Sequence, residues 1–171
     1  MDTFILIGIT GIGLGALYFL VASGLSLIYG LMGVLNFAHG SFLSVGAFVG
    51  YWVATQLGPD VNMPDFILAM IVGGLAAGGF ALLIEQLLIT RLYDRHIDQA
   101  LVTVGVSLVV GALLGGWFGN DLIMFPTPLW FLTAINVGGA MIPADRVVYI
   151  ATAVLLLIAN WALLKFTRIG L

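Results

Sequence analysis

The sequence contains no cysteine and very few charged residues. Without cysteine the chain cannot form a disulfide framework, a thiolate metal site or a catalytic thiol. Charged residues make up only 8% of the 171 positions and hydrophobic residues 62%, whereas soluble domains carry roughly 25% charged residues. Five Lys and Arg residues in total do not supply a basic face for nucleic acid. The composition therefore predicts an integral membrane protein in contact with the lipid bilayer.

Motifs for nucleotide binding, metal binding and catalysis are also missing. Neither GxxxxGK[ST] nor GxGxxG follows a soluble strand, so we expect the chain to bind no ATP itself and to need no cofactor. His39 has no second histidine at metal-ligand spacing, and His96 is a lone loop histidine, so no metal site is expected. Ser41, Ser44 and Thr103 could lie beside His39, but no acid in the local sequence orients that imidazole. We therefore expect no enzyme.

Long apolar segments dominate what is present, and they predict an all-α polytopic membrane helix bundle with about five transmembrane helices. A hydrophobic stretch of about 20 residues spans a bilayer as a helix. The first segment lacks the basic start of a cleavable signal peptide, so we expect it to stay as a membrane helix. We expect one transmembrane domain over residues 1–171. The predicted helices are residues 4–30, 37–57, 66 to about 88, 100 to about 117, and 147–164.

The first and second segments are separated by an interruption at residues 36–40, which read Asn-Phe-Ala-His-Gly. Inside a bilayer every polar group needs a partner in protein or in a cavity, and an interrupted helix exposes backbone that can bind a solute. We expect Asn36 to be the N-cap of a helix beginning at Phe37. The amides at that helix start, beside Asn36 and His39, could receive a solute carboxylate. The alternative is a cap with an imidazole that ties two helices together.

A long connection at residues 118–146 precedes the last segment. Pro126 and Pro128 forbid a continuous helix there. Alternating side chains around Gly138 and Gly139 predict a short hairpin. The aromatic residues of this connection suit a membrane interface.

Glycines spaced four apart recur in the apolar segments. In membranes this spacing lets helix backbones approach closely, and we interpret it as packing within one subunit, with dimerisation as the alternative. The pairs are Gly11 with Gly15, Gly46 with Gly50, Gly74 with Gly78, and Gly111 with Gly115.

The positions of the basic residues predict the orientation. Cytoplasmic loops are enriched in Lys and Arg. With five crossings Arg91, Arg95, Lys165 and Arg168 fall on one side, and Arg146 falls on the other. We therefore expect the amino terminus outside and the carboxyl terminus inside.

Residues 24–40, GLSLIYGLMGVLNFAHG, resemble the signature near the start of the membrane permeases of ABC importers for branched-chain amino acids, whose relatives import amides and urea. Three further stretches occur in the family's order: Glu85 with residues 91–95, residues 101–107 (LVTVGVS) and residues 167–170 (TRIG). The resemblance covers nearly all of this chain but only about the amino-terminal half of a typical family member. The chain is therefore expected to be a fragment, or a subunit whose remaining spans are supplied separately.

The resemblance implies a permease subunit of an ABC importer that translocates branched-chain or other aliphatic amino acids across the cytoplasmic (inner) membrane. Its partners would be a second permease subunit, cytoplasmic ATP-binding subunits and an external solute-binding protein facing residues 118–146. The candidate substrate-binding residues are Asn36, Phe37, His39, Gly40 and Ser41. The candidate partner-contacting residues are Glu85, Arg91, Arg95 and Arg168.

Two alternatives to this function stay open. One is a non-transporting membrane adaptor or truncated assembly subunit, and the other is a permease for urea or short amides. For Glu85 with Arg91 and Arg95, a proton relay and an ion-pair anchor that reaches water are the alternatives to a docking surface.

Overall fold

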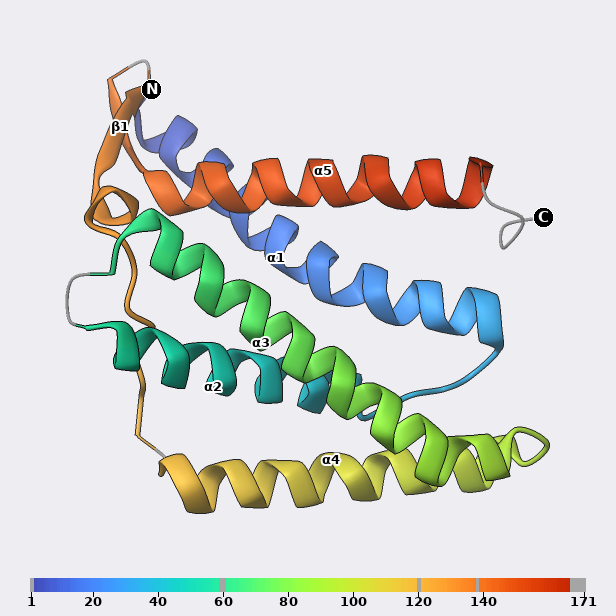
Figure 1. The fold of residues 1–171 in the computed structure, drawn as a ribbon. Helices are drawn as coiled ribbons and strands as arrows, with labels where there is room; N and C mark the ends of the chain where they lie inside the picture. The colour runs from blue at the N-terminus through green and yellow to red at the C-terminus, as the bar shows by residue number, and fades with distance from the viewer. Residues whose placement is uncertain (1, 59–60, 120, 138, 167–171) are drawn as a thin grey trace. The chain divides into compact units, whose positions relative to one another are not determined.

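The computed structural model describes residues 2–58, 61–119, 121–137 and 139–166 (Figure 1). The chain divides into two compact units. Residues 1–32 with 129–171 form the first unit, and residues 33–128 form the second. Each unit is described by itself below. The single transmembrane domain expected from the sequence stays a prediction.

The first unit consists of two long helices and a hairpin. Helix α1 is Asp2–Met32, and a 3₁₀ turn at Leu129–Leu132 precedes strands β1 (Ala134–Val137) and β2 (Ala140–Pro143), which lead into helix α5 (Ala144–Phe166). The strands pair antiparallel, with Ile135 opposite Ile142. The Asn136 side-chain oxygen accepts a hydrogen bond from the Gly139 N–H at 3.0 Å, which closes the turn. The hairpin predicted around the two glycines is confirmed, although Gly138 lies outside the described residues.

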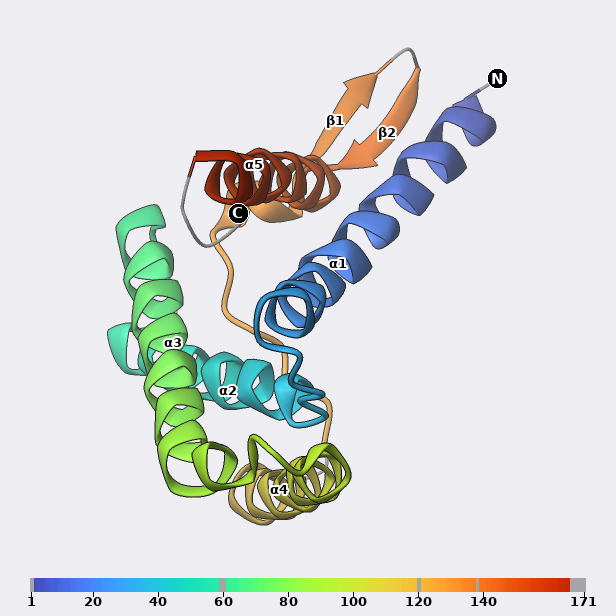
Figure 2. The same ribbon diagram turned by 90° about the vertical axis from the view of Figure 1, so that its right-hand side faces the viewer.

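The second unit contains the other three helices. Helix α2 is His39–Leu57 and helix α4 is His96–Phe118. Helix α3 (Met63–Ile84) continues into a π-helical segment (Glu85–Ile89) and a 3₁₀ turn (Thr90–Leu92). Helices α2 and α3 lie side by side in both views (Figures 1 and 2). Helix α3 starts three residues before the predicted Phe66 because a capping box between Asn62 and Asp65 satisfies its first amides.

Four of the five helical segments are long and apolar enough to cross a membrane: Thr3–Leu31, Met63–Leu92, His96–Phe118 and Ala144–Phe166. Their outer faces expose large apolar side chains, such as Leu75, Leu108 and Leu155, which are about 70% exposed in each case. Such faces are stable against lipid and not against water. The predicted all-α polytopic membrane bundle is confirmed. Helix α2 is not among these four segments, so its own crossing stays a prediction.

Helices α2 and α3 pack through glycine. A Cβ on Gly46 would lie 2.9 Å from the carbonyl oxygen of Gly73, and a Cβ on Gly50 would lie 3.1 Å from that of Ala69. Gly73 itself faces the Gly46 carbonyl oxygen, which a Cβ on Gly73 would approach to 2.5 Å. The close approach predicted for Gly46 and Gly50 is therefore confirmed, and Gly73 is the partner that the four-residue spacing missed.

Glycines of the other predicted pairs have open space around them within the described part of the chain. A Cβ on Gly11, Gly15, Gly74 or Gly78 would meet no atom within 4 Å. Close packing at these positions is not seen within either unit and stays a prediction, because spacing alone does not say which face of a helix meets a neighbour.

Candidate functional site

The interruption predicted between the first two helices is present. Helix α1 ends at Met32 and α2 begins at His39. Gly33 adopts a positive φ of 66°, a conformation that favours glycine after a helix end. The Asn36 side-chain oxygen accepts a hydrogen bond from the Ala38 N–H at 3.0 Å. This Asx turn closes the loop before the helix starts.

The expectation that Asn36 is the N-cap of α2 is wrong. Ala38 occupies that position, and the helix starts two residues later than predicted. Because Asn36 uses its side chain on the amide two residues ahead, the loop makes one more turn before the helical bonding begins. Asn36 still satisfies an amide near the helix start, and only 6% of the residue is exposed.

Helix α4 holds this loop in place through two hydroxyl groups. The Thr103 hydroxyl oxygen, which is completely buried, accepts a hydrogen bond from the Phe37 N–H at 3.2 Å. The Ser41 hydroxyl donates to the Ser107 hydroxyl at 3.0 Å. Thr103 and Ser107 are four residues apart and so lie on the same face of α4. The start of α2 is thus fixed by two successive turns of α4.

These contacts set the depth at which α2 begins. Thr103 lies seven residues after His96, the first residue of α4, which corresponds to about 10 Å along the helix axis. Further along, the rings of Phe48 and Phe118 lie 4.6 Å apart, so α2 and α4 run in the same direction. The start of α2 therefore lies about two turns along α4, a helix that is long and apolar enough to span a membrane.

One backbone N–H group in the first turn of α2 makes no hydrogen bond within the described residues. The N–H groups of Ser41 and Phe42 both bind the Ala38 carbonyl oxygen, at 2.9 and 3.1 Å. The Gly40 N–H has no acceptor among the described residues. Gly40 is exposed, and a Cβ at this position would meet no atom within 4 Å. A helix start with a free amide carries partial positive charge and can receive an anionic group.

The predicted substrate-binding residues are therefore brought together only in part. Asn36, Ser41 and the backbone of Phe37 each make a separate hydrogen bond near the start of α2, while Phe37 is exposed. His39 is half-buried and its side chain makes no hydrogen bond within the described part of the chain. Sequence reasoning gave no binding role to Thr103 and none to Ser107. Their spacing of four within an apolar helix was the available signal.

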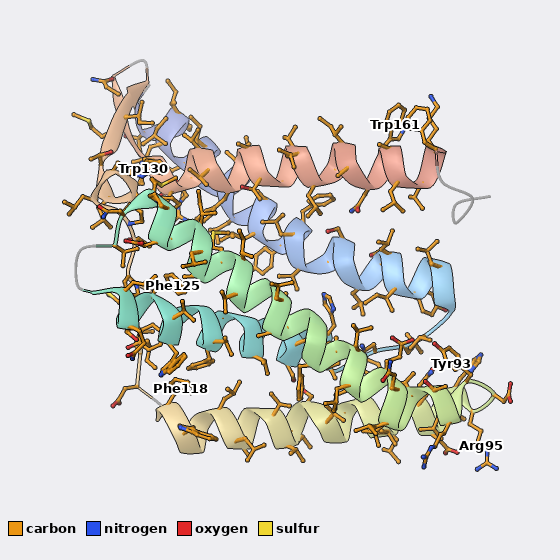
Figure 3. All side chains as sticks on the ribbon, in the orientation of Figure 1. Tyr93, Arg95, Phe118, Phe125, Trp130 and Trp161 are labelled. Carbon is orange, nitrogen blue, oxygen red and sulfur yellow. The ribbon has the colours of Figure 1, made fainter. Side chains whose placement is uncertain are left out.

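Three of the predicted partner-contacting residues, Glu85, Arg91 and Arg95, lie between the end of α3 and the start of α4, where Figure 3 labels Arg95 beside Tyr93. The Tyr93 hydroxyl donates to the Glu85 carboxylate at 3.2 Å. Partial desolvation and then this carboxylate raise the pKa of Tyr93 above its ordinary value of 10.0. Arg95 forms an exposed pair with Asp98 at 3.8 Å.

The ion pair that we considered between Glu85 and the arginines is absent from the described residues, where Glu85 bonds to Tyr93 instead. The π-helical segment explains this change, because it shifts the register of the helix end after Glu85. Arg91 is exposed, and Arg168 lies outside the described residues.

The fold and this site define a multi-pass helical membrane protein in which the start of α2 packs against Thr103 and Ser107 of a candidate membrane-spanning helix, α4. Residues 7–171 match the family of the branched-chain amino acid transport system permease component, and the chain belongs to this family.

Curated relatives agree with the family match. The chain is 23% identical over 168 residues to the high-affinity branched-chain amino acid transport system permease protein LivH of Salmonella typhimurium, covering 94% of this chain and 54% of that protein. Shorter matches are to LivH of Escherichia coli, 38% identical over 47 residues (28% of this chain, 15% of that protein), and to the corresponding permease BraD of Pseudomonas aeruginosa, 35% over 49 residues (29% and 16%). The chain thus spans about half the length of LivH of Salmonella typhimurium. No solved structure matches it.

Proposed function

We propose that this chain is a permease subunit of an ABC importer that carries branched-chain or other aliphatic amino acids across the cytoplasmic membrane. Membership of the permease family supports this proposal, as do the names of the relatives. The structural observation that carries it is the helix start held inside the span by Thr103 and Ser107. Broken helices of this kind form solute sites in transporters.

The solute carboxylate would bind at the start of α2. There the free Gly40 N–H and the positive end of the helix dipole favour an anionic group. Ser41 and His39 would supply further hydrogen bonds, Phe37 an apolar contact, and Asn36 would hold the loop in shape. The substrate-binding set is therefore the one expected from the sequence, with Asn36 as a positioning residue.

Energy would come from partners, since the chain has no nucleotide-binding motif. The complex would contain a second permease subunit, two cytoplasmic ATP-binding subunits and an external solute-binding protein. Glu85, Arg91, Arg95 and Arg168 would lie on the cytoplasmic side, where the ATP-binding subunits dock. ATP hydrolysis would then drive the permease subunits between outward-open and inward-open states.

The orientation can be tested with single cysteines, because the native chain has none. We expect Thr3→Cys to react with a membrane-impermeant maleimide in intact cells and Arg95→Cys to react only after the cells are opened. If both react only in opened cells, α2 does not cross the membrane and the amino terminus lies inside.

Transport is tested by uptake of radiolabelled leucine into proteoliposomes that hold the complete complex. We expect His39→Ala to lower ATP-dependent uptake about tenfold or more per assembled complex, since one lost hydrogen bond to a charged group is worth roughly 1.5–3 kcal/mol. Asn36→Ala should lower uptake because the Ala38 N–H loses its acceptor and the loop loses its shape. His96→Ala, at the exposed first residue of α4, is the matched control and should leave uptake unchanged.

Unchanged uptake in both variants would remove these residues from the solute path. Wild-type complexes that carry urea or short amides but no amino acid would support the alternative substrate class. Wild-type complexes that carry none of these would favour a non-transporting adaptor.

A further inference from the structure

We propose that a cleft between α2 and α4, named here the α2–α4 cleft, binds the aliphatic side chain of the transported amino acid. This inference rests on the proposed function and assigns a second part of the same solute site. The cleft lies within the second unit and has a volume of about 250 Å³. Its lining residues are Ser41, Ser44, Phe48, Val110, Gly111, Leu114, Gly115 and Gly119.

The cleft exists because one face of α4 carries hydroxyl side chains first and glycines further along the helix. Thr103, Ser107, Gly111 and Gly115 follow one another at steps of four and share that face. The first two carry hydroxyl groups that bond to the start of α2. The two glycines have no side chain to fill the space that follows. The helices are thus joined at Ser107 and again at the ring of Phe118, with a gap between these points.

The lining indicates the chemistry of the occupant. It contains no charged side chain, and its largest members are the apolar residues Phe48, Val110 and Leu114. An aliphatic group would be removed from water there without leaving a buried charge unpaired. The volume is somewhat below the roughly 300–1,000 Å³ of drug-sized ligand pockets and is large enough for the side chain of one amino acid.

The cleft borders the first turn of α2, where the proposed carboxylate site lies. Ser41 belongs both to the first turn of α2 and to the lining of the cleft. From Ser41 to Phe48 the cleft follows seven residues of α2, which is about 10 Å. A solute whose carboxylate lies at the Gly40 N–H would therefore extend its side chain along α2 toward Phe48.

The test fills the cleft from α4 and measures selectivity in complete complexes in proteoliposomes. A Cβ on Gly111 would meet no atom within 4 Å, so Gly111→Leu can place its side chain in the cleft without a backbone clash. Gly105→Leu is the matched control, because Gly105 is also on α4 with open space around it but does not line the cleft. Uptake of radiolabelled alanine is measured while unlabelled leucine, valine or alanine competes.

We expect Gly111→Leu to weaken competition by leucine relative to alanine about tenfold or more, since a mismatch of one or two carbon groups in an apolar pocket changes selectivity by about 10–200-fold. Gly111→Ala should shift the ratio in the same direction by less, and it decides the matter if Gly111→Leu does not assemble. Gly105→Leu should leave the ratio unchanged. The ratio is independent of the amount of protein.

An unchanged leucine-to-alanine ratio in both Gly111 variants would overturn the assignment of the cleft, and so would an equal loss for every amino acid. Either result is compatible with the proposed function, provided that the wild-type complex transports leucine. A wild-type complex that transports no aliphatic amino acid contradicts the proposed function itself.

Discussion

Replacing Gly73 by alanine tests whether direct backbone contact holds α2 against α3. The added Cβ would lie 2.5 Å from the carbonyl oxygen of Gly46 and 3.3 Å from the Cα and N atoms of Gly50. Carbon and carbonyl oxygen normally approach no closer than about 3.3 Å. The two helices would therefore have to separate by roughly 0.8 Å at this point. No rotamer change can relieve the contact, because the obstructing atoms are backbone.

The size of the effect follows from two opposing terms. Inserting a carbon atom into a well-packed interface costs about 1–3 kcal/mol, and contact with two backbone segments places Gly73→Ala in the upper half of that range. Alanine in place of glycine within a helix returns about 1 kcal/mol. We expect a net loss of about 1–2 kcal/mol, which lowers the ratio of folded to unfolded protein roughly 5–30-fold.

The measurement is unfolding of the purified protein in mixed detergent micelles with increasing SDS, followed by circular dichroism. Gly74→Ala is the matched control, since a Cβ on Gly74 meets no atom within 4 Å. This control should be as stable as the wild type or more stable by up to about 1 kcal/mol. The reasoning is refuted if Gly73→Ala unfolds at the same SDS fraction as Gly74→Ala.

Three further predictions use smaller changes. Thr103→Val keeps the side-chain shape but leaves the Phe37 N–H without its acceptor, so the same unfolding measurement should show a loss of about 1–3 kcal/mol, with a smaller loss for Thr103→Ser. Glu85→Gln should lower the pKa of Tyr93 toward 10.0 in an absorbance titration of tyrosine, because the negative charge that disfavours the phenolate is removed; an unchanged titration would contradict this. Since the folded-state pKa of Tyr93 is raised, its contribution to stability is complete below about pH 10 and is lost as the pH rises through the folded value. Asp65→Ala removes the exposed capping-box carboxylate of α3 and should destabilise by only about 0.5 kcal/mol in the micelle assay.

The number and type of the helices could be predicted from the sequence because lipid imposes a length and a composition on each span. The helix ends were less predictable. Helix α4 begins at His96, four residues before the apolar run, because polar residues in a first helical turn lower the hydropathy without opposing the helix. The extension of α3 through a π-helical segment had no signal in the composition.

The break between the first two helices could be located from the sequence, but the hydrogen bonds around it could not. The polar residues of the interruption mark where a helix ends inside an apolar region, and the break is present there. The sequence does not fix which backbone N–H donates a hydrogen bond to the Asn36 side-chain oxygen. Both the Ala38 N–H and an amide of the first helical turn were compatible with it, and the loop conformation decides between them. The partner of Phe37 comes from a helix more than sixty residues away, so the sequence around Phe37 could not show that its N–H bonds to Thr103.

A helix that begins inside a membrane has a requirement that a helix beginning in water lacks. Its first amides cannot turn to solvent, so the protein must supply acceptors at that depth. Asn36 supplies one from the loop itself and Thr103 supplies another from two turns inside α4. On the same face, one turn before Thr103, the side-chain nitrogen of the buried Gln99 has no partner among the described residues. A row of polar residues at steps of four near the start of an apolar helix therefore indicates where another chain segment must end its helix within the bilayer, and such a row directs the search for a solute site to that helix pair.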